Sequence, residues 1–179
     1  VHATNYQGAM DAMGYLLGLG HRRIGYISGR AELESSNRRL LGYKESLQKA
    51  GIPIDEELIA AGDYTTETGV SCARKLLALE NRPTAIFASN DQMAMGVFQV
   101  AQELGLQIPK DFSLIGFDNI PESKYLGLTT VDQFIFEMGY VGTQMLIKII
   151  NGIPLDSQTY RMQTELIVRN SCSKVNFIK

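Results

Sequence analysis

Five polar side chains in the sequence each follow an apolar run or lie at the helical pattern after one. They are an arginine, a tyrosine, an asparagine, an aspartate and a glutamine: Arg39, Tyr64, Asn90, Asp118 and Gln133. Arginine, aspartate and asparagine make directional hydrogen bonds to hydroxyl groups. A tyrosine ring packs against the apolar face of another ring. If the fold brings these groups together, the set suits a hydroxyl-rich ring.

Each candidate also has an ordinary structural interpretation. Arg39 fits a solvated helix charge, and Tyr64 fits a half-buried aromatic at the end of a strand. Asp91 fits a helix N-cap better than a ligand, because it opens a helical pattern. Asp63 and Asn119 fit turn residues. The pattern alone leaves both interpretations of these residues open.

The elements that must position these side chains appear as alternating apolar runs and helical patterns. Apolar runs predict strands at 23–28, 58–61, 84–88, 112–117, 128–131 and 166–168. Helical spacing of apolar residues predicts helices near 9–17, near 40–50, from Thr65 or Thr66 onward, from 90 to 104 and from 134 to 151.

This alternation predicts the fold class. Strands separated by helices of this length pair in parallel through right-handed crossovers. Near-continuous apolar strands require helices on both faces of the sheet. The prediction is therefore an α/β fold, a doubly wound parallel sheet. In such sheets ligands bind beyond the carboxyl ends of the strands, where the polar candidates and Ser35 fall.

The composition fits one core-bearing domain that does not itself bind nucleic acid. The chain has 179 residues, 45% of them hydrophobic, and a formal net charge of −2, whereas electrostatic DNA binders normally show a basic face. Cys72 and Cys172 lack metal or disulfide-framework spacing, and a reducing compartment fits. No apolar run approaches the ~18 residues of a membrane span, so no membrane is predicted as a partner.

Catalytic chemistry is not indicated. His2 and His21 are the only histidines, and the Gly-His-Arg-Arg setting of His21 favours a structural role. The sequence lacks HExxH, GxSxG and GxxxxGK[ST], and it has no GxGxxG in a strand–turn–helix setting. Nothing resembles a nucleophile with a base and an orienting partner. We therefore expect no enzyme, no cofactor and no metal.

Five segments resemble, in order, the motifs of one known family. Residues 20–29 are similar to GHRRIAyIsG, and residues 39–43 are similar to RlxGY. Residues 83–94 are similar to PTAIfasND.mA, residues 109–119 to P.DisviGfDd, and residues 128–133 to LTTV.Q. These matches cover nearly the whole chain. The family they resemble is that of the LacI/GalR transcriptional regulators.

The resemblance implies a two-lobed, periplasmic-binding-protein-like fold (type I) that holds a small effector between its lobes. Arg39 matches an arginine that grips effector hydroxyls or an acidic group. Tyr64 matches an aromatic that stacks on the effector ring. Asn90 and Asp118 match a polar pair at successive strand ends, and Gln133 matches the glutamine after LTTV. The implied site is therefore an effector-binding site.

Three further positions bear on this implied site. Ser35 lies where some family members use a small hydroxyl residue. Thr4 stands where members often carry an aspartate, so one polar contact is changed. Gly127 replaces a proline that commonly precedes LTT, which affects only local geometry. Of these positions, Thr4 therefore bears on effector identity, and Ser35 is the least specific of the transferred site residues.

The resemblance also implies how the chain is divided. Residues 1–179 are expected to be a fragment of an effector-binding domain, with the DNA-binding domain outside this chain. Residues 7–131 and 154–169 are expected to form the C-terminal lobe. Residues 1–6 read as the end of a strand arriving from the N-terminal lobe, and the helix at 132–151 is expected to belong to that lobe.

The implied function is effector sensing and dimerisation in a cytoplasmic transcription regulator, with repression the commoner sign. Effector binding would change the geometry of a homodimer and its affinity for operator DNA. An arginine with a carboxylate and an aromatic suits a sugar, a sugar phosphate or a purine. The alternative is a periplasmic sugar-binding protein of a transport system, which shares the fold. The segments GHRRI and LTTV.Q favour the regulator.

Overall fold

One six-stranded sheet organises the chain, which the computed structural model describes over residues 1–175. Its strands lie in the order β3-β2-β4-β5-β6-β8. They span β2 Ile24–Ser28, β3 Ile59–Ala61, β4 Ala85–Ala88, β5 Ser113–Asp118, β6 Thr129–Asp132 and β8 Glu165–Ile167. Neighbours from β3 to β6 pair in parallel. The predicted parallel sheet is confirmed.

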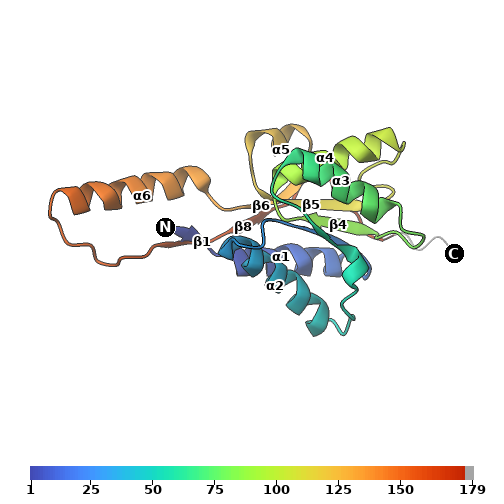
Figure 1. Ribbon diagram of the computed structural model, residues 1–179, viewed down its shortest axis with the longest axis horizontal. Coiled ribbons are helices and arrows are strands. Elements are labelled where there is room, and N and C mark those ends of the chain that lie inside the picture. The colour runs from blue at the N-terminus through green and yellow to red at the C-terminus, as the bar shows by residue number, and fades with distance from the viewer. Residues whose placement is uncertain (176–179) are drawn as a thin grey trace.

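Helices cover both faces of this sheet, as the apolar strands require (Figure 1). Helices α1 (Asn5–Gly18) and α2 (Glu34–Lys49) pack together on one face. Helices α3 (Thr66–Leu77) and α4 (Asp91–Glu103) pack together on the other face, where the short α5 (Pro121–Tyr125) also lies. The doubly wound α/β architecture is therefore confirmed.

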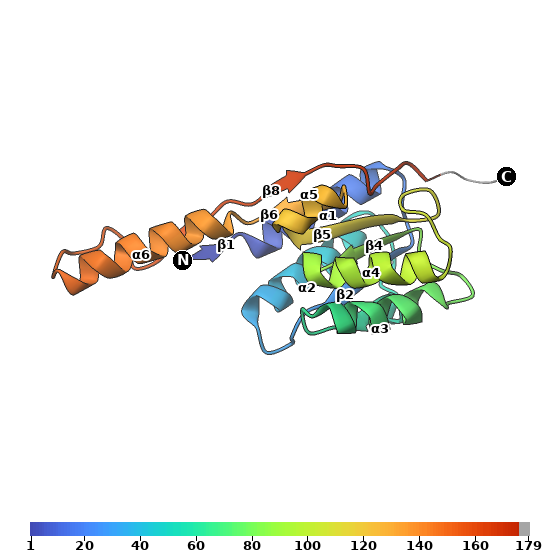
Figure 2. The same ribbon diagram turned by 90° about the horizontal axis from the view of Figure 1, so that it is seen from above.

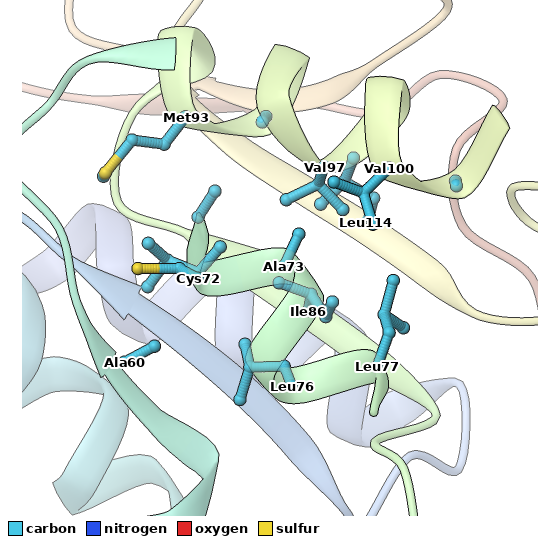
Figure 3. Close-up of a cluster of buried hydrophobic side chains, with 14 of the residues drawn as sticks. Ala60, Cys72, Ala73, Leu76, Leu77, Ile86, Met93, Val97, Val100 and Leu114 are labelled. Carbon is cyan, nitrogen blue, oxygen red and sulfur yellow. The ribbon is translucent and has the colours of Figure 1, made fainter. Parts of the chain in front are cut away.

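Strand β4 contributes side chains to two hydrophobic cores, one on each face of the sheet. Successive side chains of a strand point to opposite faces of the sheet. Ala85 and Phe87 therefore join the core under α1 and α2, while Ile86 and Ala88 join the core under α3 and α4 (Figure 3). All four residues are fully buried, which explains the continuous apolar run.

The observed elements agree with the predicted ones to within about two residues at most ends, which is the usual uncertainty of boundaries. Thr65 is the N-cap of α3, and its side chain accepts a hydrogen bond from the Thr68 backbone N–H. Helices α1 and α2 begin at Asn5 and Glu34, before the predicted starts near residues 9 and 40. Two further details differ from expectation. Asn90 is the N-cap of α4, so Asp91 is its first helical residue. Strand β8 runs antiparallel to β6, because a long excursion rather than one crossover helix leads to it.

That excursion carries helix α6 (Ile135–Ile150) away from the body of the molecule (Figures 1 and 2). The chain returns through β7 (Arg161–Met162), which pairs in parallel with β1 (His2–Ala3). Helix α6 has no buried residue. No described helix combines the length and apolarity needed to cross a membrane.

The apolar surface of α6 predicts self-association of the 179-residue chain. Phe136 is 83% exposed and Ile150 is 73% exposed, and burying such a side chain contributes about 1.5–3 kcal/mol. Light scattering during size-exclusion chromatography should therefore detect oligomers of the wild-type chain. Replacing both residues by glutamate should shift the chain toward monomer, whereas Leu104→Glu, at an exposed site on α4's C-cap, should not. A monomeric wild type with a sharp thermal transition would contradict this expectation.

Candidate ligand-binding site

All six residues predicted for the site line one open hollow of about 400 Å³. Five connections that leave the sheet at its carboxyl edge supply them. They are Ser35 and Arg39 after β2, Tyr64 after β3, Asn90 after β4, Asp118 at the end of β5 and Gln133 after β6. The structure thus brings together residues that are nearly 100 positions apart.

Arg39 lies deepest in this group and is not a solvated helix charge. Only 4% of the residue is exposed. Its Nε donates to Asn5 Oδ1 over 2.8 Å, and its Nη1 donates to the Ser89 backbone oxygen. The guanidinium carbon lies 3.6 Å from the centroid of the Phe117 ring, within the range of a cation–π contact. These contacts fix the guanidinium in one orientation.

Asp118 is the anionic partner of Arg39. Its Oδ1 lies 3.5 Å from Arg39 Nη1 and accepts a 2.6 Å hydrogen bond from Gln133 Nε2. Burial raises the pKa of the Asp118 carboxyl, the Arg39 charge opposes this rise and the nearby Asp91 adds to it, and the resulting pKa is about 7. The carboxyl therefore changes charge near neutral pH.

Tyr64 and Asn90 are held by each other. Asn90 Nδ2 donates to the Tyr64 backbone oxygen over 3.0 Å, and Asn90 Oδ1 accepts from the Met93 backbone N–H. Tyr64 has a φ of 78°, a conformation that costs a non-glycine residue free energy. A Cβ atom at Gly29 would overlap the Tyr64 ring, so the glycine lets the ring lie against the backbone. Both polar atoms of the Asn90 side chain therefore already make hydrogen bonds within the protein.

Asn5 lines the same hollow and was not predicted from the sequence. It is the first residue of α1, and in a parallel α/β unit each helix begins at the carboxyl edge of the sheet. Its Oδ1 accepts from Arg39 Nε, and its Nδ2 donates to the Ala3 backbone oxygen. His2 and Met138 also line the hollow. The candidates from the sequence were taken only from strands at residue 23 onward and no farther than Gln133, so they did not include these three residues.

Asp91 serves the fold rather than the hollow, and the expectation that it caps the helix was wrong. It is fully buried. Its Oδ2 accepts from Ser123 Oγ (2.6 Å) and the Ile120 backbone N–H (3.0 Å), and its Oδ1 accepts from Thr130 Oγ1 (2.6 Å). A Cβ at Gly116 would overlap this carboxylate. Asp91 therefore ties the turn after β5 to β6.

His21 has the structural role that its sequence setting favours. It is buried, with Nδ1 3.0 Å from Thr84 Oγ1 and Nε2 3.0 Å from Ser113 Oγ. Burial lowers the pKa of its imidazole. The described residues contain no cluster of three or more histidine, cysteine or acidic side chains that could hold a metal ion.

A protein-family model described as a periplasmic binding protein-like domain matches residues 13–172. The chain belongs to this family. The HTH-type transcriptional repressor CytR of Escherichia coli K12 is 40% identical over 173 residues, 96% of this chain and 51% of CytR. Catabolite control protein A of Priestia megaterium is 36% identical over 168 residues, 92% of this chain and 51% of that protein. The chain spans about half the length of the curated relatives it matches.

Solved structures agree with this assignment. A regulatory protein of the LacI family from Chloroflexus aggregans superimposes with a TM-score of 0.86 at 37% identity, covering 96% of this chain and 62% of that one. The regulator CelR in complex with cellobiose gives a TM-score of 0.88 at 32% identity, covering 94% and 52%. The predicted LacI-type membership is confirmed. These relatives are transcription regulators, which agrees with the prediction that the chain is not an enzyme.

Replacing Asp91 by alanine should destabilise this LacI-type domain by roughly 2–4 kcal/mol. The substitution leaves two hydroxyls and one backbone N–H without their buried acceptor, and each unsatisfied group costs free energy. Urea denaturation followed by circular dichroism measures the change. Gln92→Ala, at the exposed neighbouring position, is the matched control and should change stability by under ~1 kcal/mol. Equal effects of the two substitutions would refute the role given to Asp91.

The raised pKa of Asp118 predicts a signed pH dependence of stability. A free aspartate titrates near 3.9, whereas Asp118 in the folded chain titrates at about 7. Between these values the folded state binds the extra proton, so the free energy of unfolding falls as pH rises. Relative to Asp118→Asn, the wild type should lose about 1–4 kcal/mol between pH 5 and pH 8.

Denaturation curves at the two pH values, recorded for both proteins, provide the measurement. Asp63 offers the matched control, because hydrogen bonds from Thr65 and Thr68 hold its pKa at about 2. Its contribution is present above the unfolded pKa and disappears only in acid. Asp63→Asn should therefore leave the difference between pH 5 and pH 8 unchanged. If the free energy of unfolding of Asp118→Asn changes between pH 5 and pH 8 as much as that of the wild type, Asp118 does not titrate in this range.

Proposed function

We propose that this chain is the effector-sensing part of a LacI-type transcription regulator, and that its hollow binds a small sugar-like effector. One observation carries the proposal: residues from five separate connections converge on the hollow. The carboxyl edge of a parallel sheet is where ligands bind in such folds. Asn5, Arg39, Asp118 and Gln133 offer donors and acceptors, and Tyr64 offers a ring face.

The proposed effector lies between this unit and a second lobe to which α6 belongs. The exposed apolar residues of α6 favour this division, with residues 7–131 and 154–169 in the C-terminal lobe. Gln133, which precedes α6, bonds to Asp118. Asp132 accepts hydrogen bonds from Asn119 Nδ2 and from the Phe134 backbone N–H. A ligand that contacts Asp118 or Gln133 would thus act on the segment that leads into the second lobe.

In the whole protein, effector binding would control the affinity for operator DNA through a domain outside this chain. The curated relatives CytR and PurR are named as HTH-type transcriptional repressors, which supports a repressor over a transport protein. The proposal further places this repressor in the cytoplasm as a homodimer. One solved relative holds cellobiose and another was crystallised with phosphate. Sugars, sugar phosphates and purines are therefore the classes to examine first.

Ligand-induced stabilisation of the intact protein tests this function. A panel of sugars, sugar phosphates and purines should contain a compound that raises the thermal midpoint. A ligand at ~100 times its Kd stabilises by about 2.7 kcal/mol. The same compound should change the protein's affinity for operator DNA, because both sites must bias one equilibrium.

Site variants give this experiment its control. Arg39→Ala should weaken effector binding about ten- to a hundredfold, since it removes charge-assisted hydrogen bonds. Arg38→Ala is the matched variant, because the Arg38 side chain is 57% exposed and pairs with Glu34 on the helix surface. This variant should bind the effector normally. If Arg39→Ala leaves the ligand-induced shift intact, the hollow is not the effector site.

A further inference from the structure

A second hollow, of about 270 Å³, lies at the amino edge of the sheet, opposite the edge that carries the proposed effector site. Four segments line it: the turn before β2, the approach to β4, the turn before β5 and the last described residues. Strand β5, which joins the two edges, has six residues and therefore spans roughly 20 Å. The last described residues lie at the end of the sheet away from α6 (Figures 1 and 2). This amino-edge hollow is therefore separate from the effector site.

Three cationic side chains line the amino-edge hollow: those of Arg82, Lys110 and Lys174. All three residues are exposed. Within residues 1–175 none of them belongs to an ion pair, whereas six other lysine and arginine side chains each pair with a carboxylate. The whole chain has a formal net charge of −2. The overall charge of the chain therefore does not account for unpaired cations gathered at one place.

Among the described lining residues, Asp111 alone has a carboxylate, and that group serves its own turn. Its Oδ2 accepts a 2.7 Å hydrogen bond from the Gln107 backbone N–H. His21 also lines the hollow, and burial lowers the pKa of its imidazole, which favours the neutral form. Three cations and one carboxylate leave the lining with two positive charges in excess. The hollow therefore attracts anions.

Buried hydrogen bonds fix the floor of the amino-edge hollow. His21 is 2% exposed, with Nδ1 3.0 Å from Thr84 Oγ1 and Nε2 3.0 Å from Ser113 Oγ. Ser113 Oγ also accepts from the Ser173 backbone N–H over 3.0 Å, and Ser173 Oγ donates to the Pro109 backbone oxygen over 3.1 Å. These bonds join all four segments. The backbone positions from which the three cations extend are therefore held relative to one another.

We propose that the amino-edge hollow binds a phosphate group, either as the free ion or as a small phosphate monoester, and is a second ligand site of this protein. A phosphate group has ~1.5 to 2 negative charges and three acceptor oxygens near neutral pH. Lysine binds such a group as a point charge and arginine binds it as a fork of donors. Drug-sized ligands occupy roughly 300–1,000 Å³. A hollow of about 270 Å³ therefore fits a phosphate group with at most a small organic part.

Isothermal titration calorimetry of the intact protein with inorganic phosphate at pH 8 tests the proposal, with sodium chloride of equal ionic strength as the reference. The wild type should bind phosphate saturably. Lys110→Ala should weaken this binding about threefold to tenfold, because a charge near 4 Å changes affinity by about that factor in water. The double variant Lys110→Ala/Lys174→Ala should weaken it at least ~tenfold. Competition by glycerol phosphate would identify a monoester site, and its absence a site for the free ion.

Lys124→Ala is the matched control. Lys124 is exposed on α5, it lies outside the hollow, and its replacement removes the same charge from the protein. This variant should bind phosphate as the wild type does. No phosphate binding by the wild type, whether or not a short DNA duplex binds, would overturn the proposal, and so would equal effects of Lys110→Ala and Lys124→Ala. Neither result would touch the effector site, because these lysines do not line it.

Discussion

The buried guanidinium of Arg39 is the group on which the geometry of the site depends. A charge removed from water must find partners in the protein, or the fold loses several kcal/mol. Those partners come from separate parts of the chain: Asn5 at the start of α1, Ser89 after β4, and Asp118 with Phe117 at the end of β5. The folded arrangement of these elements is therefore also the arrangement of the hollow.

A second buried charge stabilises the backbone beside the first. Asp118 and Asn119 both have positive φ values, which are costly for residues other than glycine. The Asp91 carboxylate binds the Ile120 backbone N–H just beyond this pair and ties it to Thr130 on β6. It thereby holds the turn that aims Asp118 at Arg39. The rim of the hollow is strained backbone that buried hydrogen bonds keep in place.

Apolar periodicity sufficed to predict the sheet, because strands β2, β4, β5 and β6 are buried on both faces and therefore read as continuous apolar runs. The rule that ligands bind beyond strand ends then predicted correctly that the six candidate residues lie close together. It missed Asn5, because α1 precedes the first strand of the main sheet. Asp91 was misjudged because adjacent asparagine and aspartate are equally good N-cap types, and only packing shows which one turns inward. The antiparallel β8 lay beyond a rule that covers strand–helix–strand units.

The hydrogen bond between Gln133 and Asp118 connects the hollow to its proposed role in switching. The chain passes between the sheet and the α6 region through three segments near the hollow, and two of them are joined where the Thr4 and Thr164 hydroxyls meet at 3.0 Å. The third segment carries Gln133, which bonds to Asp118. A ligand bound in the hollow would exchange hydrogen bonds with Asp118 and Gln133, which both line it. Its binding free energy would then remain available to favour one arrangement of these segments over another, which is what allosteric coupling requires.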